Sequence, residues 1–300
     1  MSTKQIAIPQ DFILGAAASA WQTEGWSGKK PGQDSWIDLW YMNDRHVWHN
    51  GYGPAVATDF INRFREDVAL MKQAGLTHYR TSINWSRFLT DYENATVDEE
   101  YAAYYDALFD EMHRQGIEPM ICLEHYELPG VLLETYGGWA SKHVVELFVR
   151  YAEKVFERFH GKVTRWFTFN EPIVPVEGGY LYDFHYPNVV DFRRAATVAY
   201  HTVLAHAKAV QAYRAGHYAG EIGIVLNLTP SYPRSQNPAD VKAAHIADLM
   251  FNRSFLDPVL RGEYPADLVA LLKSYDQLPA CKPEDGFLIA EGKIDLLGVN

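Results

Sequence analysis

A carboxyl and an amide side chain stand next to each other at the end of an aromatic-rich run. Residues 168–172 read Thr-Phe-Asn-Glu-Pro, so Asn170 and Glu171 are adjacent and Pro172 ends the predicted strand directly after them. A glutamic acid beside apolar walls has its charged form disfavoured, which suits a general acid that works near neutral pH. For this segment alone, the alternative is a carboxylate that is solvated or paired with an arginine.

Two more polar side chains occur where apolar residues are expected. Arg80 lies inside the apolar run 77–83, and a guanidinium in such a strand needs a carboxylate partner. A salt bridge within the core is the structural interpretation of Arg80. His125 follows another apolar run, where a lone histidine is more often a structural hydrogen-bonding group than a ligand-binding one.

The spacing of the other histidines does not match a known metal-binding pattern. His46 and His49 surround Trp48 without the two-histidine, one-glutamate spacing of a zinc-binding helix. The sequence also lacks a Gly-x-Gly-x-x-Gly segment and the phosphate-loop lysine motif. We therefore expect no metal site and no loop that binds the phosphates of a nucleotide.

Composition narrows the choice of partners and compartment. The chain has 300 residues, 48% of them hydrophobic, and a net charge of −11, which argues against nucleic acids and anionic membrane surfaces as partners. The sequence has no apolar stretch typical of a signal peptide, nor one of the ~18 residues that span a membrane. Cys122 and Cys281 form no close pair, as is usual in a reducing compartment. We expect a cytoplasmic protein; the sequence does not indicate its oligomeric state.

Short apolar runs of strand length alternate with amphipathic helical stretches. The runs are residues 12–19, 77–83, 118–123, 164–169, 222–228 and 294–299. Between them, apolar residues recur every three or four positions, as in residues 60–71 and 144–159. Gly75 and Gly116 each stand where a helix should end, which suits the left-handed C-cap position. Strands joined by helical crossovers predict a parallel sheet.

Polar residues cluster at the ends of these predicted strands, which decides between two parallel architectures. They are Gln22, Arg80, His125, Asn170 with Glu171, Asn227 and Asn300. Polar groups that converge from many strand ends are typical of the catalytic face of a (β/α)8 barrel, whereas a doubly wound sheet usually carries a glycine-rich loop. We predict an α/β fold, a (β/α)8 TIM barrel of which this chain supplies strands 1–6. Residues 1–300 are expected to form a single catalytic barrel domain that is incomplete at its C-terminal end.

The same segments resemble family 1 of the glycoside hydrolases, whose members include β-glucosidases, 6-phospho-β-glucosidases and 6-phospho-β-galactosidases. The matching segments are residues 12–25, 79–87, 125–129, 168–172, 255–258, 261–265 and 295–300. They occur in the family's order along the whole chain. Each is weak alone, and together they are highly specific.

The resemblance implies a role for each candidate residue. Glu171 would be the acid/base, and Asn170 would bond the 2-hydroxyl of the sugar. Gln22 and His125 would hold hydroxyls on the far side of the ring. Asn300 would line the same subsite, and Arg80 would orient and keep ionised a nucleophilic carboxylate. The family carries that nucleophile in a Thr-Glu-Asn-Gly-like segment on the seventh strand, and residues 1–300 contain no such segment. The implied reaction needs no cofactor.

The substrate class is suggested by a departure from the commoner pattern of the family. After His125 this chain has Tyr126 and Glu127, where many β-glucosidases of the family have Trp and Asp. This variation looks more like the branch that acts on 6-phosphorylated glycosides. We therefore expect a 6-phospho-β-glucoside or 6-phospho-β-galactoside as the small-molecule substrate. The alternatives are a β-glucosidase for unphosphorylated sugars and a catalytically inactive sugar-binding relative.

Overall fold

The computed structural model describes residue 9 and residues 12–300. Six parallel strands form its main sheet, in the spatial order β1-β2-β5-β6-β7-β8. The strands are β1 (Gly15–Ala17), β2 (His78–Ser82), β5 (Glu118–Glu124), β6 (Arg165–Asn170), β7 (Glu221–Leu226) and β8 (Leu296–Val299). A separate antiparallel pair consists of β3 (Leu89–Asp91) and β4 (Thr96–Val97). All six predicted runs form strands, although β1 and β8 are shorter than expected and Asn227 lies just after β7.

The helices fall between the strands, as the alternating pattern predicts. They are α1 (Ala20–Thr23), α2 (Trp36–Asn43), α3 (Phe60–Gln73), α4 (Trp85–Phe88), α5 (Glu99–Arg114), α6 (Gly130–Tyr136), α7 (Lys142–Phe159), α8 (Ile173–Tyr180), α9 (Phe192–Ala215), α10 (Pro238–Asp248), α11 (Ser254–Arg261), α12 (Ala266–Ser274) and α13 (Pro283–Glu291). A π-helical turn, Leu249–Arg253, joins α10 to α11. In the part of the chain that the structure describes, no helix is both long and apolar enough to cross a membrane.

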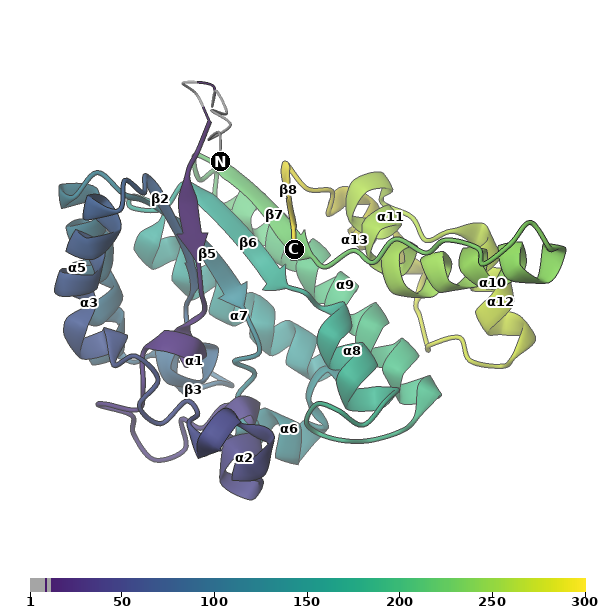
Figure 1. Ribbon diagram of the computed structural model, residues 1–300, viewed down its shortest axis with the longest axis horizontal. Helices are drawn as coiled ribbons and strands as arrows, with labels where there is room; N and C mark the ends of the chain where they lie inside the picture. Colours follow the sequence, from purple (N-terminus) through teal and green to yellow (C-terminus); the bar gives the residue numbers. More distant parts are fainter. Residues whose placement is uncertain (1–8, 10–11) are drawn as a thin grey trace, which may run out of the picture.

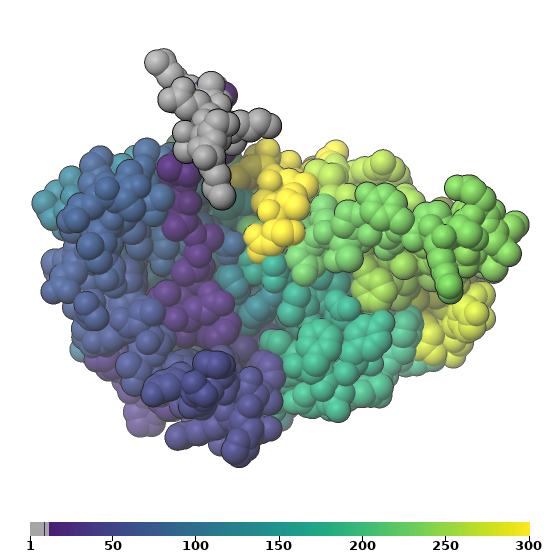
Figure 2. All heavy atoms as spheres, viewed as in Figure 1, coloured from purple at the N-terminus to yellow at the C-terminus, as the bar shows by residue number. Residues whose placement is uncertain are grey.

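Strand order identifies the sheet as part of a barrel. Each strand lies beside its predecessor in the main sheet, without the reversal of order that defines a doubly wound sheet. Figure 1 shows the long helices α3, α5, α7 and α9 around the outside of this curled sheet. In Figure 2, the atoms of β1 (purple) and of the last residues (yellow) lie on either side of teal atoms from the middle of the chain. The predicted barrel architecture is confirmed for these six strands.

Aromatic packing fixes the strand ends that carry the polar residues. The apolar face of α7 is buried against the sheet, as the spacing of residues 144–159 predicts. From this face, the Tyr151 hydroxyl donates to the carbonyl oxygens of Ile83 and Leu123, at 2.9 and 3.0 Å. Its ring stacks on Trp85, with ring centroids 5.3 Å apart. One buried side chain therefore holds the ends of β2 and β5 together.

Two helix ends show the glycine geometry that the sequence predicts. Gly75 follows α3 with a backbone φ of +82°, and Gly116 follows α5 with φ of +69°. A side chain in this left-handed region would be strained, so glycine allows each helix to end sharply before the next strand.

Candidate active site

Asn170 is the centre of a hydrogen-bonded cluster at the C-terminal edge of the sheet. The side chain ends β6 and is buried. Its Oδ1 accepts from Arg80 Nη1 on β2 at 2.7 Å and from Asn300 Nδ2 after β8 at 3.2 Å. Its Nδ2 lies 3.0 Å from Nε2 of His125, which follows β5. Four strands thus bring four of the predicted residues into direct contact.

Glu171 joins the same cluster through both carboxylate oxygens. Oε2 accepts from the Tyr126 hydroxyl at 2.9 Å, and Oε1 accepts from Asn300 Nδ2 at 2.7 Å. The backbone N–H of Glu171 donates to the Val225 carbonyl on β7 at 2.8 Å. The side chain is half-buried, so its carboxylate is fixed in direction and still accessible. A carboxyl group placed in this way can donate a proton to, or accept one from, a bound molecule.

Arg80 contacts polar neutral groups instead of a core carboxylate. Its Nη1 donates to Asn170 and lies 3.3 Å from His125 Nδ1. Among the residues that the structure describes, no carboxylate forms an ion pair with Arg80, which argues against the core salt bridge. The guanidinium instead adds a positive charge to a cluster of buried amide and imidazole groups.

The imidazole of His125 is neutral at ordinary pH. Burial, together with the nearby charge of Arg80, lowers the pKa of His125 to about 3. Donors face both ring nitrogens, with Asn170 Nδ2 3.0 Å from Nε2 and Arg80 Nη1 3.3 Å from Nδ1. A neutral imidazole has one accepting nitrogen, and the shorter contact favours Nε2. This tautomer is inferred from the hydrogen-bond geometry. His125 is therefore a fixed polar group and not a proton carrier near neutral pH.

Gln22 is the one predicted site residue that makes no contact with this cluster. It lies in α1 and its side chain is exposed. None of the other five residues, all of which the structure describes, forms a hydrogen bond with it. Gln22 instead lines an aromatic pocket with Trp21, Tyr41 and Trp48. Its role in binding a sugar hydroxyl stays a prediction.

The sequence did not predict the network that positions His125 and Tyr126. The fully buried Glu127 accepts from Ser82 Oγ at 2.5 Å and from the backbone N–H of His125 at 2.6 Å. Ser82 Oγ in turn accepts from the Ala20 N–H at 2.8 Å. Burial, reinforced by Glu124, raises the pKa of Glu127 well above its usual range. Glu124 and Glu127, two acidic residues directly after the apolar run 119–123, are the sequence signal that could have revealed it.

The described part of the chain contains no candidate metal-binding site. Within residues 9 and 12–300, no group of three or more His, Cys, Asp or Glu side chains is arranged to hold a metal ion. The donors that surround Asn170 and Glu171 are amide, imidazole, guanidinium and phenol groups, which suit hydroxyl and carboxylate partners.

Comparison with known proteins matches the sequence and fold of this chain to one family. The family model for glycosyl hydrolase family 1 matches residues 4–300. The chain is 47% identical over 299 residues to 6-phospho-beta-glucosidase GmuD of Bacillus subtilis, covering 99% of this chain and 64% of that protein. It is 33% identical over 297 residues to Beta-glucosidase A of Acetivibrio thermocellus, covering 99% of this chain and 65% of that protein. The chain thus spans less than two thirds of the length of these relatives.

Solved structures agree with the sequence comparison. The crystal structure of the AHE enzyme from Alicyclobacillus herbarius superimposes with a TM-score of 0.91 at 33% identity, covering 99% of this chain and 67% of that one. That of the psychrophilic beta-glucosidase BglU from Micrococcus antarcticus gives 0.89 at 36% identity, covering 98% and 62%. With its strand order, its strand-end polar cluster and the matching family model, this chain belongs to glycosyl hydrolase family 1.

Proposed function

We propose that the protein is a retaining β-glycosidase in which Glu171 is the general acid/base. The observation that supports this most directly is the placement of its carboxylate. Tyr126 and Asn300 each donate to one of its oxygens, beside the buried Asn170 and His125 and the half-buried Arg80. A carboxyl group held beside several hydroxyl-binding side chains is what protonation of a glycosidic oxygen requires.

The proposed reaction is a double displacement. Glu171 donates its proton to the leaving oxygen while a second carboxylate attacks the anomeric carbon and forms a glycosyl-enzyme. Glu171 then takes a proton from water, and the hydroxide displaces the enzyme carboxylate, so the anomeric configuration is retained. From the family resemblance, we place the second carboxylate on a seventh strand outside residues 1–300, ~5–5.5 Å from Glu171.

The remaining cluster residues would bind the sugar ring and the nucleophile. Asn170 is held by Arg80 and Asn300, so it would present its amide to the 2-hydroxyl without further ordering. Hydrogen bonds to that hydroxyl strengthen in the oxocarbenium-like transition state and so lower the barrier. Arg80 carries a charge that would orient the nucleophilic carboxylate and keep it ionised.

For the substrate, we propose a 6-phospho-β-glucoside or 6-phospho-β-galactoside. The segment 125–129 supports this choice, as do the names of two relatives, 6-phospho-beta-glucosidase GmuD and Aryl-phospho-beta-D-glucosidase BglC, at 47% and 34% identity. Sugars that are phosphorylated during uptake occur inside the cell, so we propose the cytoplasm as the compartment. The resemblance to Beta-glucosidase A favours an unphosphorylated β-glucoside as the second candidate.

The test compares kcat/KM of the intact protein for aryl β-glucoside and β-galactoside, each with and without a 6-phosphate. Charged hydrogen bonds to a phosphate should favour the phosphorylated substrate by about 2–4 kcal/mol, or roughly 30- to 1000-fold. Equal or better turnover of the neutral sugars would reject the phosphorylated substrate and support the second candidate. No turnover of any of the four would support an inactive sugar-binding protein.

A further inference from the structure

A pocket with both polar and apolar walls is lined by residues of α8 and of the segment that follows β7. Its volume is about 370 Å³, including its open mouth. The residues that line it are Ile173, Glu177, Asn227, Thr229, Ser231 and Phe251. None of them belongs to the cluster around Asn170.

The chain connects this pocket directly to the acid/base. Ile173 begins α8 two positions after Glu171, and Asn227 follows β7, whose Val225 carbonyl accepts the Glu171 N–H. His125 lies on the opposite side of β6, because the sheet order places β5 and β7 on either side of it. A general acid acts between the sugar ring and the leaving group. If the ring lies over Asn170 and His125, the leaving group lies toward this pocket.

Glu177 gives the pocket an unpaired carboxyl group. Among the residues that the structure describes, no side chain or backbone N–H donates to its carboxylate, whereas its backbone carbonyl accepts from the N–H groups of Leu181 and Tyr182. Burial raises the pKa of Glu177 above its usual value, and no neighbouring group offsets this. The carboxylate oxygens are free to accept hydrogen bonds from a ligand that brings hydroxyl groups into the pocket.

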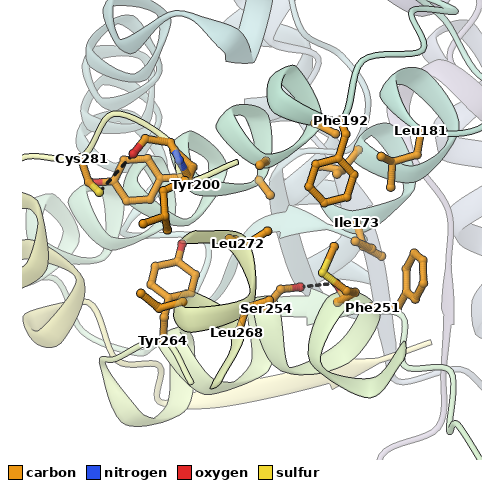
Figure 3. Close-up of a pocket in the computed structure, with 18 residues that line it drawn as sticks. Ile173, Leu181, Phe192, Tyr200, Phe251, Ser254, Tyr264, Leu268, Leu272 and Cys281 are labelled. Carbon is orange, nitrogen blue, oxygen red and sulfur yellow. Dashed lines mark hydrogen bonds between the residues drawn. The ribbon is translucent and has the colours of Figure 1, made fainter. Parts of the chain in front are cut away.

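Apolar side chains also line this pocket. Figure 3 shows Ile173 and Phe251 close together at one end of a second, largely apolar pocket, and both residues line the two pockets. A sugar ring has an apolar C–H face and a rim of hydroxyls, so it can contact Phe251 and Glu177 at the same time. An aryl group would contact the apolar wall and leave Glu177 unpaired.

We propose that this pocket binds the sugar that leaves when the glycosidic bond is cleaved, and that Glu177 determines a preference for β-linked disaccharides over aryl glycosides. The inference rests on the proposed function, because it places the leaving group beside Glu171. It adds no chemical step, and Glu177 acts by accepting hydrogen bonds from the hydroxyls of the departing sugar.

The experiment measures kcat/KM of the intact protein with two substrates that share the same non-reducing sugar. One is a β-linked disaccharide and the other a p-nitrophenyl β-glycoside, both with the 6-phosphate if the wild type requires it. Glu177→Gln should lower kcat/KM for the disaccharide roughly 10- to 100-fold, because charged hydrogen bonds are lost. The value for the aryl substrate should change less than about twofold. Glu153→Gln, a matched change at an exposed position on the outer helix α7, should alter neither value.

A second variant guards against a substitution that merely perturbs folding. Thr229→Val removes a hydroxyl from the same pocket and should also lower only the disaccharide value. The inference is overturned if Glu177→Gln lowers kcat/KM equally for both substrates. It is also overturned if this variant has the wild-type melting temperature and lowers kcat/KM for neither. Both outcomes would leave the proposed role of Glu171 intact. A wild type that hydrolyses neither substrate would overturn the proposed function itself.

Discussion

Two residues of the site occupy backbone conformations that side chains usually avoid. Glu171 has a φ of +50° and Tyr126 a φ of +70°. Such conformations cost of order 1–3 kcal/mol each and tend to occur at functional sites. Each of the two residues lies within two positions of a strand end, and their side chains meet in the hydrogen bond between Tyr126 and Glu171. The surrounding structure therefore holds the carboxylate in place at some expense in stability.

The proposed role of Glu171 as the general acid predicts that the effect of its substitution depends on the leaving group. Glu171→Gln cannot protonate a poor leaving group, so hydrolysis of alkyl glycosides and disaccharides should fall by about 10²–10⁴-fold. Glycosides with an acidic phenol as leaving group need little protonation and should still form the glycosyl-enzyme rapidly. Steady-state and burst kinetics on a series of leaving groups measure this difference. A loss of equal size across the series would show that Glu171 is not the acid.

Glu124 is a buried carboxyl group directly beneath the site. Its side chain is 2% exposed, and its Oε1 has no hydrogen-bond partner among the described residues. Burial raises the pKa of Glu124 from 4.5 to about 7. Between these values the folded protein binds this proton more tightly than the unfolded chain does. The stability that Glu124 contributes is therefore present below pH 4.5 and lost as the pH rises through 7.

Glu124→Gln should remove this pH dependence. At pH ~8 the variant should be more stable than the wild type by on the order of 3 kcal/mol, whereas near pH ~4.5 the two should differ much less. Urea denaturation at both pH values measures the change, with Glu153→Gln as the exposed control. An advantage of the same size at both pH values would mean that packing, and not ionisation of Glu124, is responsible.

At the level of elements, Ser82 and Glu127 join three segments beneath the site. Ser82 on β2 bonds Ala20 at the start of α1 and Glu127 after β5. Ser82→Ala would leave the Ala20 N–H and one oxygen of Glu127 unpaired, so we expect a loss of about 2–4 kcal/mol in the free energy of unfolding. Denaturant unfolding of Ser82→Ala, Glu127→Gln and the double variant gives the coupling energy. Strictly additive losses would contradict a direct interaction between the two side chains.

The sequence predicted the strands and most of the site for a common physical reason. Apolar runs of strand length identify a parallel sheet, and parallel strands end at the same edge. That rule brings Arg80, His125, Asn170 and Asn300 together without knowledge of side-chain conformations. β1 is shorter than predicted because Gly15–Ala17 alone pairs with β2.

The individual side-chain hydrogen bonds of the site depend on backbone conformation and burial, which the pattern of residue types in the sequence does not specify. The bond from Tyr126 to Glu171 requires the left-handed backbone at both residues. The bond from Ser82 to Glu127 requires a carboxyl group to be buried, which is the reverse of its usual preference. Gln22 was placed with the site because it follows a strand, but α1 turns its side chain toward solvent.

At the scale of the whole molecule, the sheet has two outer strands. In a polypeptide of residues 1–300, β1 pairs only with β2 and β8 only with β7 among the residues that the structure describes. Unpaired edges next to apolar surface favour association with other chains. We expect this polypeptide to form concentration-dependent oligomers, measured by light scattering. Val299→Lys, at an exposed position on β8, should weaken the association, and a monomer at all concentrations would contradict the expectation.

The hydrogen bond between Asn300 and Glu171 joins residues that are synthesised at different times. During synthesis, β5 with Tyr126 precedes Glu171, but Asn300 follows it by 129 residues. At roughly 5–20 residues per second, the ribosome needs about 6–26 s to cover that distance. Until then one oxygen of the Glu171 carboxylate lacks its donor, although the neighbouring strands can already pair. In the nascent chain, Tyr126 can therefore contact the proposed acid/base well before Asn300 supplies the second donor.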